Sequence, residues 1–185
     1  ALAYSDIQTN LCSIVVDGFG DRSTASISRI DSLYDITEVW SCNYPVSLGL
    51  FYSAITDFLG FQVNEGEFKV MGLSAFGNSE SKVAKKVFDL VHWDNEKNKI
   101  LLDMSYFSYH TSPINSYSAK LETVLGTPRN PYLPLNPGDD NFQHFADIAR
   151  GAQDVVVKVL SEIFKHAHNI LSLIHISEPT RPDEI

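Results

Sequence analysis

The chain has 185 residues, of which 44% are apolar and 20% are charged, a composition typical of a globular domain with a sizeable core. Its 23 acidic and 14 basic residues give a net charge of -9, and the basic residues form no run, so a nucleic-acid partner is not expected. The sequence shows no secretory leader and its apolar runs are too short to cross a bilayer, so we expect a cytoplasmic protein that binds no membrane.

The amino-terminal part predicts a small antiparallel meander of three strands, at about 12–17, 23–30 and 34–40. Its first turn contains Asp17, Gly18 and Gly20. Glycine lets the backbone take a positive φ and approach a ligand closely, and the carboxylate of Asp17 would leave the end of a buried strand, where it can hold a cation. The turn is therefore a candidate phosphate or metal site, with a purely structural hairpin turn as the alternative.

Beyond the meander the sequence predicts four helices, at about 47–59, at 66–77, from 79 or 81 to 91, and at 142–170. Between the last two helices it predicts a polar turn at 94–98, a strand from 100 and a proline-rich loop at 126–141. Loops of this length in compact domains tend to be functional or mobile. The last helix carries a continuous apolar stripe and is expected to pack across the sheet. The aromatic segment at 106–117 either lines a substrate cleft or forms an edge of the core or of a lid.

The helix predicted at 66–77 is bracketed by glycines and carries Glu67 and Lys69 near its start. An acid in the first turn of a helix is favoured by the helix macrodipole. A purely capping role for Glu67 is therefore the alternative to a catalytic one.

Cysteines and histidines show none of the spacings that mark a metal or redox site. Cys12 and Cys42 have no CxxC pattern and predict free thiols, with a disulfide between them left open. His166 and His168 are two residues apart on a predicted helix and so point to different faces. No HExxH, GxSxG, Walker or GxGxxG motif is present, so hydrolase, protease and P-loop functions have no support.

Three sequence blocks follow the Asp-Gly-x-Gly turn in a specific order and spacing: YPVSLGLFYSA at 44–54, LGF at 59–61 and GEFKVMGL at 66–73. With these blocks the chain resembles the O-carbamoyltransferase family, which includes nodulation-factor, cephamycin and aminoglycoside carbamoyltransferases. The LLDMSYF block at 101–107 and the helix that begins near Gln143 are also similar to the family. The resemblance covers about residues 1–170.

This resemblance implies a mixed α/β domain of the actin-like ATPase fold, which is related to ribonuclease H. In the family, a YrdC-like domain of the same chain makes carbamoyl adenylate from carbamoyl phosphate and ATP. The actin-like domain then transfers the carbamoyl group to a hydroxyl of a small-molecule acceptor, at a site that holds iron(II). The resemblance thus predicts a transferase of biosynthesis, with iron(II) as cofactor and ATP and carbamoyl phosphate as co-substrates.

The resemblance also implies roles for individual residues. Asp17 matches the turn aspartate that binds the metal, and Glu67 is a candidate general base or substrate-orienting group. Lys69 is a candidate for neutralising phosphate as a point charge. The candidate cofactor-binding positions are Gly18, Gly20 and Gly72.

The sequence departs from the family at both ends. The family's histidine motif and its later metal-binding aspartate are expected before Ala1 and after residue 170, so we expect a truncated domain that is inactive in isolation. Residues 171–185 begin with a string that matches the translation of a transposon-end sequencing adaptor, and we expect them to be read-through and not native.

Two other functions remain open at this point. One is a nucleotide-binding member of the actin-like superfamily, such as a sugar-kinase-type enzyme, and the other is an inactive remnant that only binds. Similarity of fold alone does not separate them from a carbamoyltransferase.

Overall fold

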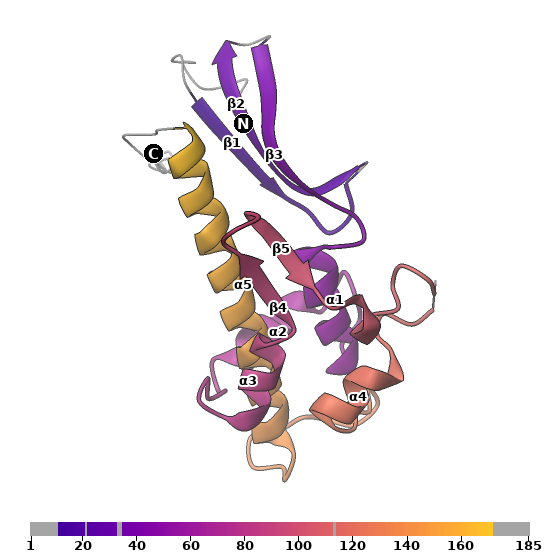
Figure 1. Cartoon of the computed structure of the whole chain (residues 1–185). Helices are drawn as coiled ribbons and strands as arrows, with labels where there is room; N and C mark the ends of the chain where they lie inside the picture. Colours follow the sequence, from indigo (N-terminus) through magenta and orange to yellow (C-terminus); the bar gives the residue numbers. More distant parts are fainter. Residues whose placement is uncertain (1–10, 21, 33–34, 113, 172–185) are drawn as a thin grey trace, which may run out of the picture.

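The computed structural model describes residues 11–20, 22–32, 35–112 and 114–171. These residues form a mixed α/β structure in which a three-stranded antiparallel sheet stands on a layer of helices, with a small β-hairpin beside it (Figure 1). The elements are β1 (Leu11–Val16), β2 (Ser23–Ser32), β3 (Asp35–Asn43), α1 (Leu48–Phe58), α2 (Glu67–Ser74), α3 (Lys82–Phe88), β4 (Val91–Asp94), β5 (Lys99–Leu102), a short 3-10 turn η2 (Met104–Tyr106), α4 (Ala119–Leu125) and α5 (Phe142–Leu171).

The sheet has the order β1-β2-β3, and its register places Ile14 opposite Ile27 and Ile27 opposite Trp40. Directly opposite residues share a face, so these three side chains lie on one side, where Ile27 is fully buried. Val15 points to the other side and is 52% exposed. The expectation that Asp17 leaves a buried strand is therefore wrong for the described residues, because only one face of β1 is covered.

The predicted meander is confirmed, although β3 continues to Asn43 and residue 34 lies outside the described part of the chain. The two cysteines are both free thiols. Cys12 is opposite Arg29 and Cys42 is opposite Ala25, so the register separates them along β2 and leaves no place for a disulfide between them.

Helix α5 is the longest element and runs from the helical layer up to the sheet (Figure 1). The predicted helix at 142–170 is confirmed within one residue. Its apolar stripe is buried from Phe145 through Val155 to Ala167, whereas Ile170 at its end is 40% exposed. It packs against α2, α3 and α1 and also reaches β4 and β1. No described helix is long and apolar enough to cross a membrane.

Two glycines allow the α2–α3 region to lie directly on α5. A Cβ at Gly151 would be 2.6 Å from the Ala84 carbonyl oxygen of α3, and one at Gly77 would collide with the Ala146 carbonyl oxygen of α5. Asp147, which is only 8% exposed, fixes the same crossing because its Oδ1 accepts the Asn78 N–H at 2.8 Å. Backbone contact of this kind has no room for a side chain.

An aromatic cluster joins the sheet to the hairpin and to α5. The ring centroids of Trp40 and Trp93 are 5.7 Å apart, and His166 of α5 lies 6.0 and 5.8 Å from them. The Trp40 indole N–H also donates to the Asn98 carbonyl oxygen in the β4–β5 turn at 2.6 Å. These contacts hold the sheet against the remainder of the described chain.

The helices differ from the prediction at the end of α2, which stops at Ser74 and not at 77, at the end of α3, and by the presence of α4. The third helix ends at Phe88, and Val91–Asp94 forms a strand where a helix was expected to reach 91, because its pairing with β5 places Val91 in the core. Helix α4 was not predicted. Phe107 in the aromatic segment is 2% exposed and packs on Phe51, so this residue belongs to the core.

The α3–α5 crossing gives a stability prediction. Gly151→Ala should lower the free energy of unfolding by about 1–3 kcal/mol, because the added methyl group meets backbone atoms that cannot move aside. Gly72→Ala is the matched control, since nothing lies within 4 Å of a Cβ at this helical position and alanine should be neutral or stabilising by up to about 1 kcal/mol. Thermal unfolding of the two variants measures the difference, and equal effects would contradict the packing argument.

The aromatic cluster gives a pH prediction. Burial lowers the pKa of His166 from its ordinary value of 6.5, so the folded chain binds this proton less readily than the unfolded chain. Its contribution to stability should be complete above pH 6.5 and should be lost as the pH falls below that value. The loss of melting temperature between pH 8 and pH 5 should be smaller in His166→Gln than in the parent protein. Equal losses would show that His166 is not responsible.

Candidate functional site

The turn between β1 and β2, which contains the candidate metal ligand Asp17, rests on the first turn of α1. A Cβ at Gly49 would lie 2.6 Å from Gly18 Cα and 2.9 Å from Gly18 N. Only glycine at position 49 therefore allows the helix and the turn to approach this closely. The sequence predicted a helix from Ser47 but gave no sign that its first glycine contacts the turn.

Ser47 connects the turn and the helix through hydrogen bonds. Its side chain is buried, and its hydroxyl donates to the Gly18 carbonyl oxygen at 2.7 Å while accepting the Leu50 N–H at 3.0 Å. Ser47 is thus the N-cap of α1 and a tertiary link at the same time. The buried Thr24 donates to the Val46 carbonyl oxygen at 2.5 Å and fixes the segment just before the cap.

Asp17 projects from this turn into solvent, and its Oδ1 accepts the adjacent Gly18 N–H at 2.6 Å. In the part of the chain that the structure describes, no three His, Cys, Asp or Glu side chains come close enough to hold a metal ion. An iron(II) site needs several ligands, and Asp17 supplies one oxygen. The described residues therefore do not fit an iron site by themselves.

The two glycines of the turn act differently from the prediction. Neither Gly18 nor Gly20 takes a positive φ, whereas Gly60, Gly126 and Gly138 do. Gly20 is required because a Cβ there would collide with the Ser23 carbonyl oxygen where the hairpin closes. A Cβ at Gly18 would meet nothing within 4 Å, so only Gly20 is needed for its small size, and neither glycine is needed for a positive φ.

Glu67 lies over the face of α1 that contacts the β1–β2 turn. It contacts this face at Ser53, one helical turn beyond Gly49. Its carboxylate accepts hydrogen bonds from the Ser53 hydroxyl at 3.2 Å, the Asn64 N–H at 2.9 Å and the Gly66 N–H at 3.2 Å. Ser53 is four residues after Gly49, so the two residues share a face of the helix. The structure thus brings Glu67 and the Asp17 turn to one side of α1. The two backbone bonds also show that Glu67 organises the start of α2.

Tyr52 and Gln153 extend this polar region toward α5. The Tyr52 hydroxyl donates to Gln153 Oε1 at 3.1 Å. Burial, with a smaller contribution from the charge of Glu67, raises the pKa of Tyr52 to about 12. Tyr52 therefore stays a neutral hydrogen-bonding group at physiological pH. Neither residue was singled out from sequence, because the contact joins positions that are far apart in the chain.

Lys69 and Gly72 lie on other sides of α2. Residues 67 and 69 are about 200° apart around a helix, so their side chains diverge. The Lys69 ammonium lies 5.9 Å from the centre of the Phe61 ring, and Gly72 is exposed with open space around it. The structure does not join these two residues to Asp17 and Glu67. Their predicted roles stay predictions.

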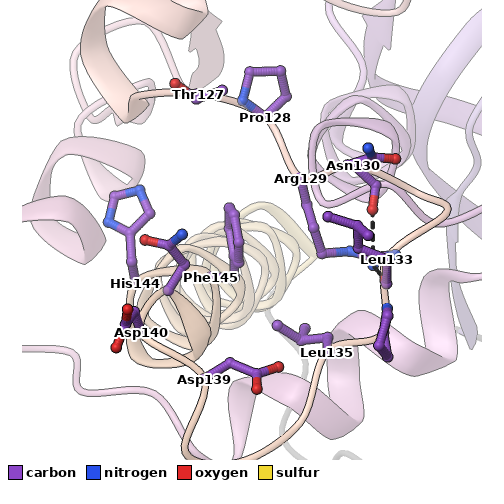
Figure 2. A pocket seen from close by; sticks show the side chains of 12 residues that line it. Thr127, Pro128, Arg129, Asn130, Leu133, Leu135, Asp139, Asp140, His144 and Phe145 are labelled. Atoms are coloured by element: carbon purple, nitrogen blue, oxygen red, sulfur yellow. Dashed lines mark hydrogen bonds between the residues drawn. The ribbon is translucent and has the colours of Figure 1, made fainter.

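A cleft of about 780 Å³ opens at the other end of α1, between the proline-rich loop and the start of α5 (Figure 2). Phe145 and Leu135 form its apolar side, and Asp139 and His144 contribute polar groups. These polar groups are held by the protein itself: Asp139 Oδ2 accepts the Asn136 N–H at 2.7 Å, and His144 Nε2 donates to the Leu125 carbonyl oxygen at 2.8 Å.

Comparison with known proteins identifies the chain. The family described as "Carbamoyltransferase N-terminus" matches residues 5–174. The chain belongs to this family. A curated relative, "Uncharacterized protein sll1178" from Synechocystis sp., is 33% identical over 161 residues. That alignment covers 86% of this chain and 25% of the relative, so the chain spans about a quarter of the length of the curated relative it matches.

In this carbamoyltransferase N-terminal domain, sequence reasoning missed Arg129. Its guanidinium donates to the carbonyl oxygens of Leu59 at 2.5 Å, Gly60 at 2.8 Å and Leu133 at 2.7 Å. It thereby caps the carboxyl end of α1, where the helix dipole favours a cation, and fastens the proline-rich loop to it. A single arginine among prolines carries no local signal for this role.

The contact between α1 and the turn predicts the effect of removing the Ser47 hydroxyl. Ser47→Ala should lower the free energy of unfolding by about 1–2 kcal/mol, because the helix cap and the bond to Gly18 are lost together. Ser81→Ala is the matched control, since Ser81 caps α3 through the Ala84 N–H without touching the turn. Denaturant unfolding should show the larger loss for Ser47→Ala, and equal losses would mean that the link to the turn contributes nothing.

Proposed function

We propose that this chain forms part of the actin-like catalytic domain of a cytoplasmic O-carbamoyltransferase. The reaction would transfer a carbamoyl group from carbamoyl adenylate, made from carbamoyl phosphate and ATP by a YrdC-like domain of the longer protein, to a hydroxyl of a small-molecule acceptor. The observation that carries this proposal is the family match over residues 5–174. The mixed α/β architecture with an antiparallel meander is compatible with it.

The placement of Glu67 supports a role in this transfer. In the proposed reaction the acceptor oxygen attacks the carbamoyl carbon, the bond from that carbon to the adenylate phosphate oxygen breaks, and AMP leaves. The hydroxyl proton must pass to a base, and a positioned carboxylate can accept it. Glu67 is held by three hydrogen bonds on the side of α1 that also carries the Asp17 turn. Such fixed geometry favours proton transfer at a defined place.

Iron(II) enters this proposal only through Asp17. When bound, the metal would polarise the carbamoyl carbonyl group. Asp17 would provide one ligand, and we propose that the other ligands belong to parts of the longer protein. Because the described residues do not complete such a site, the proposed step relies on Glu67 alone.

The longer protein that contains this segment provides the test. It is incubated with labelled carbamoyl phosphate, ATP, iron(II) and a panel of hydroxyl compounds, and products are separated by mass. The proposal expects a carbamate ester of the acceptor together with AMP. Formation of a phosphorylated acceptor and ADP would identify a kinase instead, and the absence of any product would indicate a protein that only binds.

The role of Glu67 gives a separate prediction. Glu67→Gln keeps an oxygen that can accept from Ser53 and the Asn64 N–H, gives up the longer bond from the Gly66 N–H, and cannot take a proton. If Glu67 is the base, kcat should fall by about 10²–10⁴-fold with little change in melting temperature. Glu65→Gln, the same change on an exposed neighbour, is the control and should leave kcat unchanged. An unaltered kcat in Glu67→Gln would leave Glu67 with its structural role alone.

A further inference from the structure

A groove of about 540 Å³ runs between α2 and the proline-rich loop, and it is called the α2 groove here. Its lining includes Phe61, Leu73 of α2, Phe142 of α5 and prolines of the loop. The groove is shallow and open along its length. It shares Arg129, Leu133, Pro134 and Leu135 with the cleft of Figure 2.

The charges of the α2 groove are all of one sign. Lys69 and Arg129 line it, and no carboxylate does so in the part of the chain that the structure describes. Both cations face the same ring, since the Lys69 ammonium lies 5.9 Å and the Arg129 guanidinium carbon 4.8 Å from the centre of Phe61. This lining contrasts with the net charge of -9 of the whole chain, and it makes the groove a place where an acidic ligand is favoured.

The two cations differ in what they have available for a ligand. Most N–H groups of Arg129 already donate hydrogen bonds to backbone carbonyl oxygens at the end of α1 and in the loop. Lys69 is exposed and forms no ion pair with a described residue, although Glu65 precedes it by four positions. Its ammonium therefore offers three donors to an anion above the groove.

Large apolar side chains are exposed both in the α2 groove and on the other sides of α2. Phe76 packs against Phe142 with ring centroids 5.7 Å apart, yet it remains 59% exposed. Phe68 and Met71 on the same helix are 63% and 51% exposed. Exposed aromatic and methionine side chains beside arginine are typical of surfaces that bind other proteins.

We propose that the α2 groove docks an acidic peptide segment of a partner protein. An aromatic or aliphatic side chain of the segment would enter the groove against Phe61 and Phe76, and its carboxylates would bind Lys69 and face Arg129. The choice of an acidic partner follows from charge complementarity, because Lys69 and Arg129 line the groove and no described carboxylate does. A peptide fits better than a small molecule because the groove is open to solvent, whereas small ligands favour enclosed pockets.

Selection from a random dodecapeptide library displayed on phage tests this proposal with the full chain as the target. We expect enriched peptides that combine Asp or Glu with Phe, Trp or Leu, and their binding should weaken as salt is raised. Lys69→Glu should weaken the enriched peptides by about tenfold or more, since the mutated position then repels their carboxylates. Phe76→Ser should also weaken them, through loss of apolar contact.

Lys82→Glu is the matched control, because Lys82 is exposed at the start of α3 outside the groove and undergoes the same change of charge. It should leave peptide binding within about twofold of the parent chain. Melting temperatures of all three variants show whether the fold is intact. No enrichment over an unrelated target protein, enriched peptides without acidic residues, equal effects of Lys69→Glu and Lys82→Glu, or binding unaffected by Phe76→Ser would each overturn the proposal.

Discussion

The packing of α1 against the β1–β2 turn is the contact on which the arrangement of this domain depends. The backbone of Gly18 lies on Gly49, and the Ser47 hydroxyl joins the two segments by a bond of 2.7 Å to the Gly18 carbonyl oxygen. A buried hydrogen bond next to backbone contact leaves little freedom, because neither side can shift without losing the bond or colliding. The direction in which Asp17 leaves the sheet is set by this contact.

The remainder of the fold keeps α1 in place at its other end and along its side. Arg129 donates to the carbonyl oxygens of Leu59 and Gly60 directly after α1, and α5 packs against α1 while reaching the sheet. Gly77 and Gly151 let the α2–α3 region lie against α5 without an intervening side chain. The glycines thus hold these elements together by allowing their backbones to pack directly, and Arg129 adds hydrogen bonds at the end of α1.

Glu67 caps the start of α2, and the proposed function would make the same side chain a base. Its two backbone bonds belong to the start of α2, and its bond to Ser53 holds it against α1. Tyr52, with its pKa raised to about 12, adds a neutral hydrogen-bonding group nearby. A carboxylate fixed from several sides has little freedom to turn away from a substrate, which is a requirement for a base and also the ordinary result of a good cap.

The sequence by itself determined the elements whose signal is local. The period of 3.6 residues predicted α1 and α5, and the alternation broken by glycine predicted the meander. The ordered blocks at 44–54 and 66–73 indicated the carbamoyltransferase family. Tertiary structure alone decided what depends on contacts between distant positions. It placed Glu67 beside the Asp17 side of α1, turned Lys69 toward Phe61 and the groove, and gave Arg129 its position at the end of α1. Periodicity and turn chemistry show which face of an element is apolar, but they do not show which other segment will cover that face. The positions of Glu67, Lys69 and Arg129 depend on which segments pack together, so they could not be predicted from the sequence.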